Sequence, residues 1–181
     1  MSKPSEVIIL AEDRRQQTFA YRYLLRLGID RQVIRPEPLP GNKGSGEQWV
    51  RLRYAKNVAA YRTRSATADT ALVVVIDADT GPVDRRTHQL HAVLAETGSA
   101  LRHPNEKIVH LIPKRHIETW ILCLNGRNVD ENKSYRHENG IDDQIKPSAE
   151  TLFDWSRPNA VPPRRCIPSL LLAIPEIRRL E

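Results

Sequence analysis

Two short runs of apolar, mostly β-branched residues place the strongest constraint on the fold. The first runs from Glu6 to Ala11 and the second from Ala71 to Ile76. Both runs are too short for a typical helix and are nearly continuous rather than alternating, so each predicts a strand that is buried on both faces. An acidic residue follows each run at once: Glu12 after the first and Asp77 after the second.

Segments in which apolar residues recur at helical spacing lie between these two predicted strands and two further predicted strands. Helices are expected at residues 13–27, 48–64, 84–97 and 116–126, and the additional strands at 29–34 and 107–113. Alternating strands and helices are typical of an α/β fold with a mostly parallel sheet and helices on both faces. The sequence therefore predicts that fold class for residues 1–126.

After residue 126 the pattern is looser. Residues 127–181 are expected to form a C-terminal extension of helices and loops that packs on the same domain. Proline is rarely tolerated inside a helix, so the helical pieces are expected to be short. The prolines concerned are Pro158, Pro162, Pro163, Pro168 and Pro175.

Composition limits the class of protein and the kind of partner. The 181 residues are 40% hydrophobic and 28% charged, a globular balance, and no apolar stretch is long enough to predict a membrane span. Neither a signal peptide nor a CxxC pair is apparent, so a cytoplasmic protein with reduced cysteines is expected. The 28 Lys and Arg against 22 Asp and Glu give a net charge of +6, which favours nucleic acid as a partner.

The acidic residues after the two runs are the main candidates for chemistry. Glu12, Asp77 and Asp79 all follow strands, where functional groups of parallel sheets gather. If the strand end continues in extended form, alternation puts Asp77 and Asp79 on one side. Three converging carboxylates need a hard cation, so Mg²⁺ or Mn²⁺ is predicted. The alternative is that these residues are turn formers or helix caps.

The same residues resemble two motifs of a known family. The segments Ile9-Leu10-Ala11-Glu12 and Val74-Val75-Ile76-Asp77-Ala78-Asp79, each followed by a helix, look like the signature motifs of the Toprim fold. That fold is shared by topoisomerases, bacterial primases, recombination proteins and the nucleases of the overcoming-lysogenization-defect class. The segment from Ile112 to Trp120 is similar to one in small bacterial Toprim-like proteins that are often encoded beside ATPases and are suspected in phage defence.

The resemblance covers about the first 125 residues and implies roles for individual side chains. Glu12 would be the acid/base or metal-linked glutamate, and Asp77 and Asp79 would be metal ligands. The chain departs from the family pattern at one position: Toprim glutamates usually precede a glycine, whereas Glu12 precedes Asp13. Asp13 is therefore a candidate to assist or replace Glu12.

Further candidates lie near these acids or on a basic helix. Glu118 is expected in the first turn of a helix. It is a candidate catalytic residue, as a further metal ligand or as a residue that orients Lys114 or Arg115, and the alternative is an exposed glutamate favoured by the helix dipole. The trio Lys114, Arg115 and His116 is expected to contact nucleic acid, or else to be solvated. Arg51 and Arg53, on the helix at 48–64, are expected to contact phosphates.

Three functions are compatible with these patterns. The leading hypothesis is a Mg²⁺-dependent nuclease that cleaves DNA or RNA, as the effector of a defence system with a separate ATPase. The first alternative is a noncatalytic module that binds nucleic acid or a partner protein. The second is a phosphotransferase that acts on small nucleotides. No GxxxxGK[ST] loop is present in the sequence, so the chain is not expected to be a P-loop ATPase itself.

Overall fold

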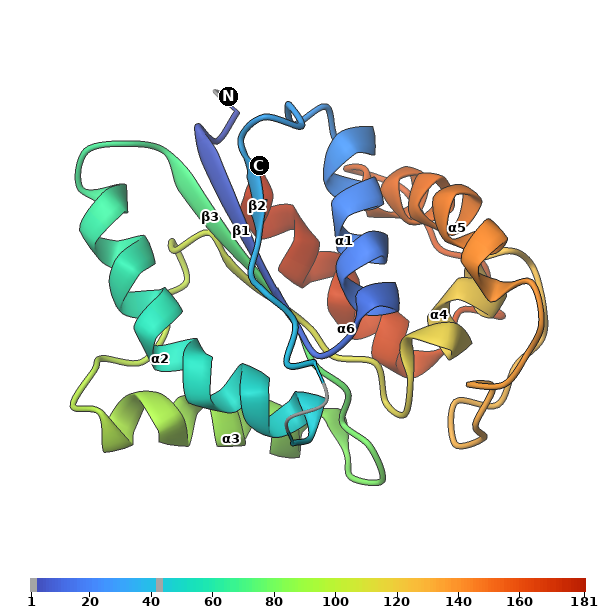
Figure 1. Ribbon diagram of the computed structural model, residues 1–181. Coiled ribbons are helices and arrows are strands. Elements are labelled where there is room, and N and C mark those ends of the chain that lie inside the picture. The colour runs from blue at the N-terminus through green and yellow to red at the C-terminus, as the bar shows by residue number, and fades with distance from the viewer. Residues whose placement is uncertain (1–2, 42–43) are drawn as a thin grey trace.

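A four-stranded parallel sheet forms the centre of the protein (Figure 1). The computed structural model describes residues 3–41 and 44–181. Within them the strands are β1 (Glu6–Ala11), β2 (Ile34–Pro36), β3 (Thr70–Val75) and β4 (Ile108–Leu111), in the order β2-β1-β3-β4. The predicted α/β class with a parallel sheet is confirmed.

The two apolar runs of the sequence form the two central strands. β1 and β3 pair in parallel along their whole length, from Glu6 opposite Thr70 to Ala11 opposite Val75. Every residue of β3 is buried, as expected of a strand with a core on each face. Because the two strands end at the same level, the acidic residues that follow them leave the sheet at the same edge.

Helices cover both faces of the sheet (Figure 1). One core packs α2 (Gly46–Ser65) and α3 (Val83–Glu96) against side chains such as Leu10, Leu72 and Val74. The opposite core packs α1 (Arg14–Arg26), α4 (Ile117–Leu124), α5 (Ile141–Ser156) and α6 (Pro168–Ile177) against side chains such as Ile9 and Val73. A short 3₁₀ helix, Arg178–Leu180, follows α6.

The helix ends near the site have local causes in the sequence. α1 begins after Asp13, whose carboxylate accepts a hydrogen bond from the Gln16 backbone N–H at 2.9 Å. α1 ends before Gly28, whose φ of +84° is a conformation that glycine adopts without steric cost. Ser45 caps α2 in the same way as Asp13 caps α1, through the Gln48 N–H.

Two expectations about secondary structure were wrong. The strand expected at 29–34 is the three-residue edge strand β2, which starts only at Ile34. The Asp30 side chain accepts from the Gln32 N–H at 2.7 Å and so forms a turn where the strand was expected. α5 extends over 16 residues although Pro147 lies within it. The prolines on which the expectation rested lie outside α5, and Pro147 removes only one backbone donor from it.

Two further observations bear on the sequence analysis. Cys123 and Cys166 are both buried and unpaired. Among the residues that the structure describes, no helix has the length and apolarity needed to cross a membrane.

Candidate functional site

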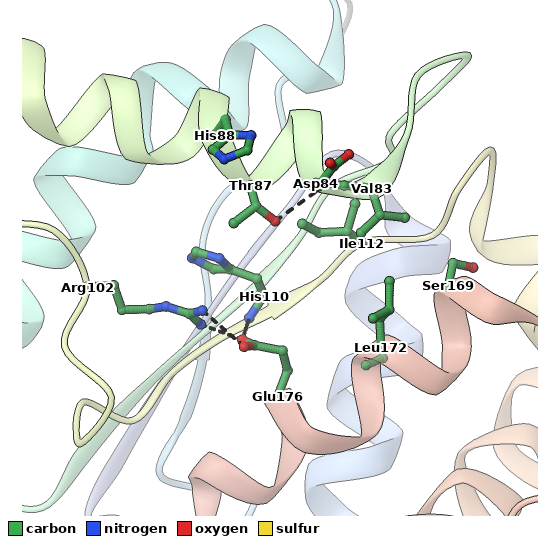
Figure 2. Close-up of a pocket in the computed structure, with 11 residues that line it drawn as sticks. Val83, Asp84, Thr87, His88, Arg102, His110, Ile112, Ser169, Leu172 and Glu176 are labelled. Atoms are coloured by element: carbon green, nitrogen blue, oxygen red, sulfur yellow. Dashed lines mark hydrogen bonds and ion pairs between the residues drawn. The ribbon is translucent and has the colours of Figure 1, made fainter.

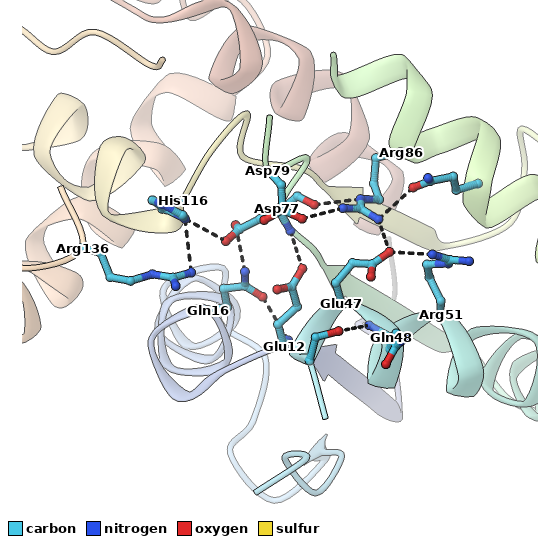
Figure 3. Close-up of polar contacts among 12 residues, drawn as sticks. Glu12, Gln16, Glu47, Gln48, Arg51, Asp77, Asp79, Arg86, His116 and Arg136 are labelled. Atoms are coloured by element: carbon cyan, nitrogen blue, oxygen red, sulfur yellow. Dashed lines mark hydrogen bonds and ion pairs between the residues drawn. The ribbon is translucent and has the colours of Figure 1, made fainter. Parts of the chain in front are cut away.

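Glu12 and Asp77 meet where β1 and β3 end (Figure 3). The Asp77 backbone N–H donates a hydrogen bond to Glu12 Oε1 at 2.7 Å. Asp77 is almost completely buried, with 1% of its surface exposed, and Glu12 is partly buried. The parallel register of the two strands therefore brings together two of the three carboxylates that the sequence predicted to converge.

Gln16 on α1 bridges these two acids, and the sequence analysis missed it. Its Oε1 accepts from the Glu12 N–H at 3.0 Å, and its Nε2 donates to Asp77 Oδ1 at 2.9 Å. Gln16 is fully buried. The available signal was its place three residues after the helix cap Asp13, where a glutamine side chain commonly turns back towards the start of the helix.

The close approach of buried carboxylates changes their protonation. Burial, and then the charge of Asp77, raise the pKa of Glu12 to about 9. Burial raises the pKa of Asp77 well above its usual value, with further contributions from the charges of Asp13 and Glu118. Burial thus favours the protonated form of Glu12 at neutral pH, and it acts on Asp77 in the same direction.

Asp79 is oriented differently from the sequence prediction. β3 ends at Val75, and Asp79 has a left-handed backbone with φ of +59°, so the extended alternation that was assumed does not reach it. A turn closes here through the hydrogen bond from the Gly81 N–H to the Ala78 carbonyl oxygen at 3.1 Å. The exposed Asp79 side chain forms an ion pair with Arg86, from Nη2 to Oδ2 at 2.9 Å.

Glu12 and Asp77 carry the oxygen ligands that a hard cation prefers. The carboxylates of Glu12, Asp77 and Asp79 do not converge on a common position, however. Over residues 3–41 and 44–181, no three acidic, histidine or cysteine side chains lie together closely enough to hold a metal ion. Oxygen donors that crowd together and hold protons are suited to Mg²⁺ or Mn²⁺. Of the three predicted ligands, Glu12 and Asp77 are the two whose positions suit such an ion.

Glu118 lies in the first turn of α4 and is buried, not exposed as one expectation had it. Its Oε1 accepts from Arg15 Nη1 at 2.8 Å, and the same arginine contacts Asp142 of α5 through Nε at 2.8 Å. Glu118 therefore orients Arg15 rather than Lys114 or Arg115. This network joins α1, α4 and α5 beside the acidic pair.

His116 is the member of the basic trio that reaches the acids. Its Nδ1 lies 3.5 Å from Asp77 Oδ2 and 3.3 Å from Nη2 of the exposed Arg136 (Figure 3). Burial, and then the charge of Arg136, lower the pKa of His116. Arg115 donates to the Asn132 carbonyl oxygen at 3.3 Å, and both Lys114 and Arg115 are partly exposed.

The predicted phosphate contacts on α2 have partners within the protein. Arg51 forms an ion pair with Glu47 at 2.8 Å. Arg53 pairs with Glu37 at 3.2 Å and stacks over the Trp49 ring, 3.8 Å from its centroid. Their charges are thus partly compensated, which leaves the region around His116 and Arg136 as the less compensated basic surface beside the acids.

A second concavity, separate from the acidic pair, lies between α3 and α6 (Figure 2). It has a volume of about 250 Å³, and the ion pair between Arg102 and Glu176 lies on its wall. The buried His110 also lines it, and the His110 Nε2 is 2.8 Å from the Tyr54 hydroxyl. None of Glu12, Asp77 and Asp79 lines this cavity.

Comparison with known proteins adds no functional information. No family model, no curated protein and no solved structure matches the chain. The functional assignment therefore rests on the geometry and chemistry of the described residues.

Gly46 at the start of α2 packs directly on Glu12, which makes it sensitive to substitution. A Cβ at this position would lie 2.7 Å from Glu12 Cβ and 2.8 Å from the Glu12 carbonyl oxygen. Gly46→Ala is expected to destabilise the protein by about 1–3 kcal/mol, because the clash outweighs the gain in helix propensity. Chemical denaturation would measure the change. Gly98→Ala offers a comparison with open space around the new Cβ, although its φ of +67° adds backbone strain. Wild-type stability of Gly46→Ala would contradict the close packing.

Proposed function

We propose that this protein is a Mg²⁺- or Mn²⁺-dependent phosphodiesterase that cleaves DNA or RNA, on a Toprim-like scaffold. One observation carries the proposal: Glu12 and Asp77, from two neighbouring parallel strands, are joined by a 2.7 Å hydrogen bond. Burial raises the pKa of both. Burying two acids side by side costs stability, and shifted pKa values of this kind cluster at functional sites.

The chain's own residues supply several steps of the proposed reaction. A bound divalent cation would polarise a phosphate oxygen and stabilise the leaving oxygen. Glu12 would either complete the shell of the cation or, once the cation has displaced its proton, accept the proton of the attacking water. Gln16 would keep Asp77 in place through its 2.9 Å hydrogen bond.

Basic residues beside the acids would bind the phosphates of the polymer. Arg136 is exposed, and its guanidinium lies next to His116, on the side of Asp77 away from Arg86 (Figure 3). Lys114 and Arg115 precede His116 in the same loop. Phosphate contacts of this type give affinity without reading sequence, and they weaken as the salt concentration rises.

A cation titration against a panel of nucleic acids tests the proposal. Purified protein is incubated with single- and double-stranded DNA and RNA at increasing Mg²⁺ or Mn²⁺, and products are resolved on denaturing gels. Cleavage of at least one polymer is expected, and EDTA should abolish it. Asp84→Asn, which removes an exposed carboxylate from the first turn of α3, is the matched control and should cleave normally. Cleavage that persists in EDTA, or none with any substrate, would contradict the proposal.

The second candidate is a noncatalytic module that binds nucleic acid or a partner protein. The ion pair of Asp79 with Arg86 favours it, since a carboxylate that is satisfied internally is not free for a cation. Binding that falls with salt but does not depend on Mg²⁺ would support this candidate over the first. A separate ATPase as partner and a cytoplasmic location belong to the proposal in either case.

A further inference from the structure

Arg86 is a buried arginine whose contacts all lie beside the acidic pair. Only 6% of its surface is exposed. Its Nε donates to the Asp77 carbonyl oxygen at 2.8 Å, its Nη2 to Asp79 Oδ2 at 2.9 Å, and its Nη1 to Gln89 Oε1 at 2.8 Å. The same Nη1 pairs with Glu47 (Figure 3). A charge this deeply buried is tolerated only when it is so completely paired.

The positive charge of the Arg86 guanidinium compensates part of the negative charge at this site, as a bound cation would. It neutralises Asp79, it contacts the backbone of Asp77, and its charge acts to lower the pKa of Glu12 against the larger effect of burial. Asp79 is therefore held towards Arg86 on α3 rather than available to Glu12 and Asp77.

We propose that Arg86 is a positioning residue that holds Asp79 out of the cation site, and that cation binding requires Asp79 to exchange Arg86 for the ion. The inference deepens the function proposed above and rests on its cation site. In the cation-bound protein Arg86 keeps Glu47, Gln89 and the Asp77 carbonyl oxygen as partners. No buried charge is left unpaired by the exchange.

The surroundings of Asp79 allow this movement. The Asp79 side chain is 52% exposed, whereas that of Arg86 is 6% exposed, so the aspartate is the partner that can leave. A polar cavity of about 240 Å³ opens beside both residues and is also lined by Glu47 and Gly81. An ion pair with one exposed member is readily broken, because water replaces the lost contact.

Mn²⁺ binding without nucleic acid tests the inference. The free ion is measured by electron paramagnetic resonance during titration of wild-type protein, Arg86→Gln and Arg85→Gln. Arg85 is the matched control for loss of charge: it lies on the same turn and lines the same polar cavity, whereas the ion pair of Asp79 is with Arg86. Arg86→Gln is expected to bind Mn²⁺ about fivefold more tightly, which corresponds to about 1 kcal/mol. Arg85→Gln should change the affinity less than about twofold.

A variant that lacks the Asp79 carboxylate distinguishes two effects of Arg86 on cation affinity: its ion pair with Asp79 and the general repulsion between its charge and the cation. In Asp79→Asn, the additional change Arg86→Gln should give no gain in affinity, because the competing pair is already absent. A gain that persists there, or equal affinities for Arg86→Gln and Arg85→Gln, would overturn the inference.

Two further measurements keep the test decisive. Circular dichroism establishes that Arg86→Gln is folded. If it is not, Glu47→Gln replaces it: Arg86 then has one carboxylate fewer and should hold Asp79 more tightly, so Mn²⁺ should bind about twofold more weakly. Unchanged or tighter binding by Glu47→Gln would overturn the inference. Since these titrations contain no nucleic acid, their outcome is independent of whether the protein cleaves a phosphodiester.

Discussion

Replacement of Asp77 by asparagine is expected to lower cation-dependent phosphodiester cleavage by about a thousandfold. The asparagine keeps an oxygen that can accept from Gln16 Nε2, a hydrogen bond of 2.9 Å in the wild-type protein. It removes the negative charge that would hold the cation. Burial raises the pKa of Asp77 well above its usual value, so an uncharged side chain loses less hydration there than the carboxylate does. Single-turnover cleavage assays at saturating Mn²⁺ measure the loss.

The Asp77→Asn protein is expected to fold, so a loss of cleavage would reflect a chemical role of Asp77 rather than a structural one. Asp77→Asn is expected to melt no lower than the wild-type protein in EDTA, since it relieves repulsion with Asp13 and Glu118. Retention of most of the cleavage activity by folded Asp77→Asn would exclude Asp77 from the reaction.

Glu12→Gln is expected to stabilise the cation-free protein at alkaline pH. The pKa of Glu12 is raised by burial to about 9 in the folded chain, against 4.5 without these surroundings. As the pH rises from about 4.5 to about 9, the unfolded chain loses this proton while the folded chain retains it, so the free energy of unfolding of the wild-type protein falls. Glutamine has no such proton to lose, and its amide oxygen can still accept from the Asp77 N–H.

Thermal unfolding in EDTA at pH 5 and pH 8 measures this effect. At pH 8 the variant should be more stable by about 3 kcal/mol, or about 6–12 °C in Tm. The difference should shrink to about 1 kcal/mol or less at pH 5, where the wild-type carboxyl is protonated in the folded chain and only about a quarter protonated in the unfolded chain. Identical pH profiles for the two proteins would show that Glu12 is not buried with a raised pKa.

The features that could be predicted from the sequence are those fixed by local pattern. Continuous apolar runs identified β1 and β3, and the rule that functional groups follow parallel strands placed Glu12 and Asp77 at one edge. The Glu12 contact with the Asp77 N–H at 2.7 Å then depends only on the strands ending at one level.

The features that were missed depend on contacts between distant residues. Nothing in the residues around Arg86 indicates that it reaches Glu47, 39 positions earlier in the chain, or that it turns Asp79 away from Asp77. Arg136 likewise reaches His116 only through the packing of the C-terminal part. β2 was misplaced because the turn at Asp30 depends on a side-chain hydrogen bond that strand propensity does not include.

The most direct test of the cation site is an anomalous difference map from crystals soaked in MnCl₂. One peak is expected in contact with the carboxylates of Glu12 and Asp77, with Asp79 turned from Arg86 towards the ion. Absence of a peak between Glu12 and Asp77 while the Asp79–Arg86 ion pair stays intact would contradict the proposed site.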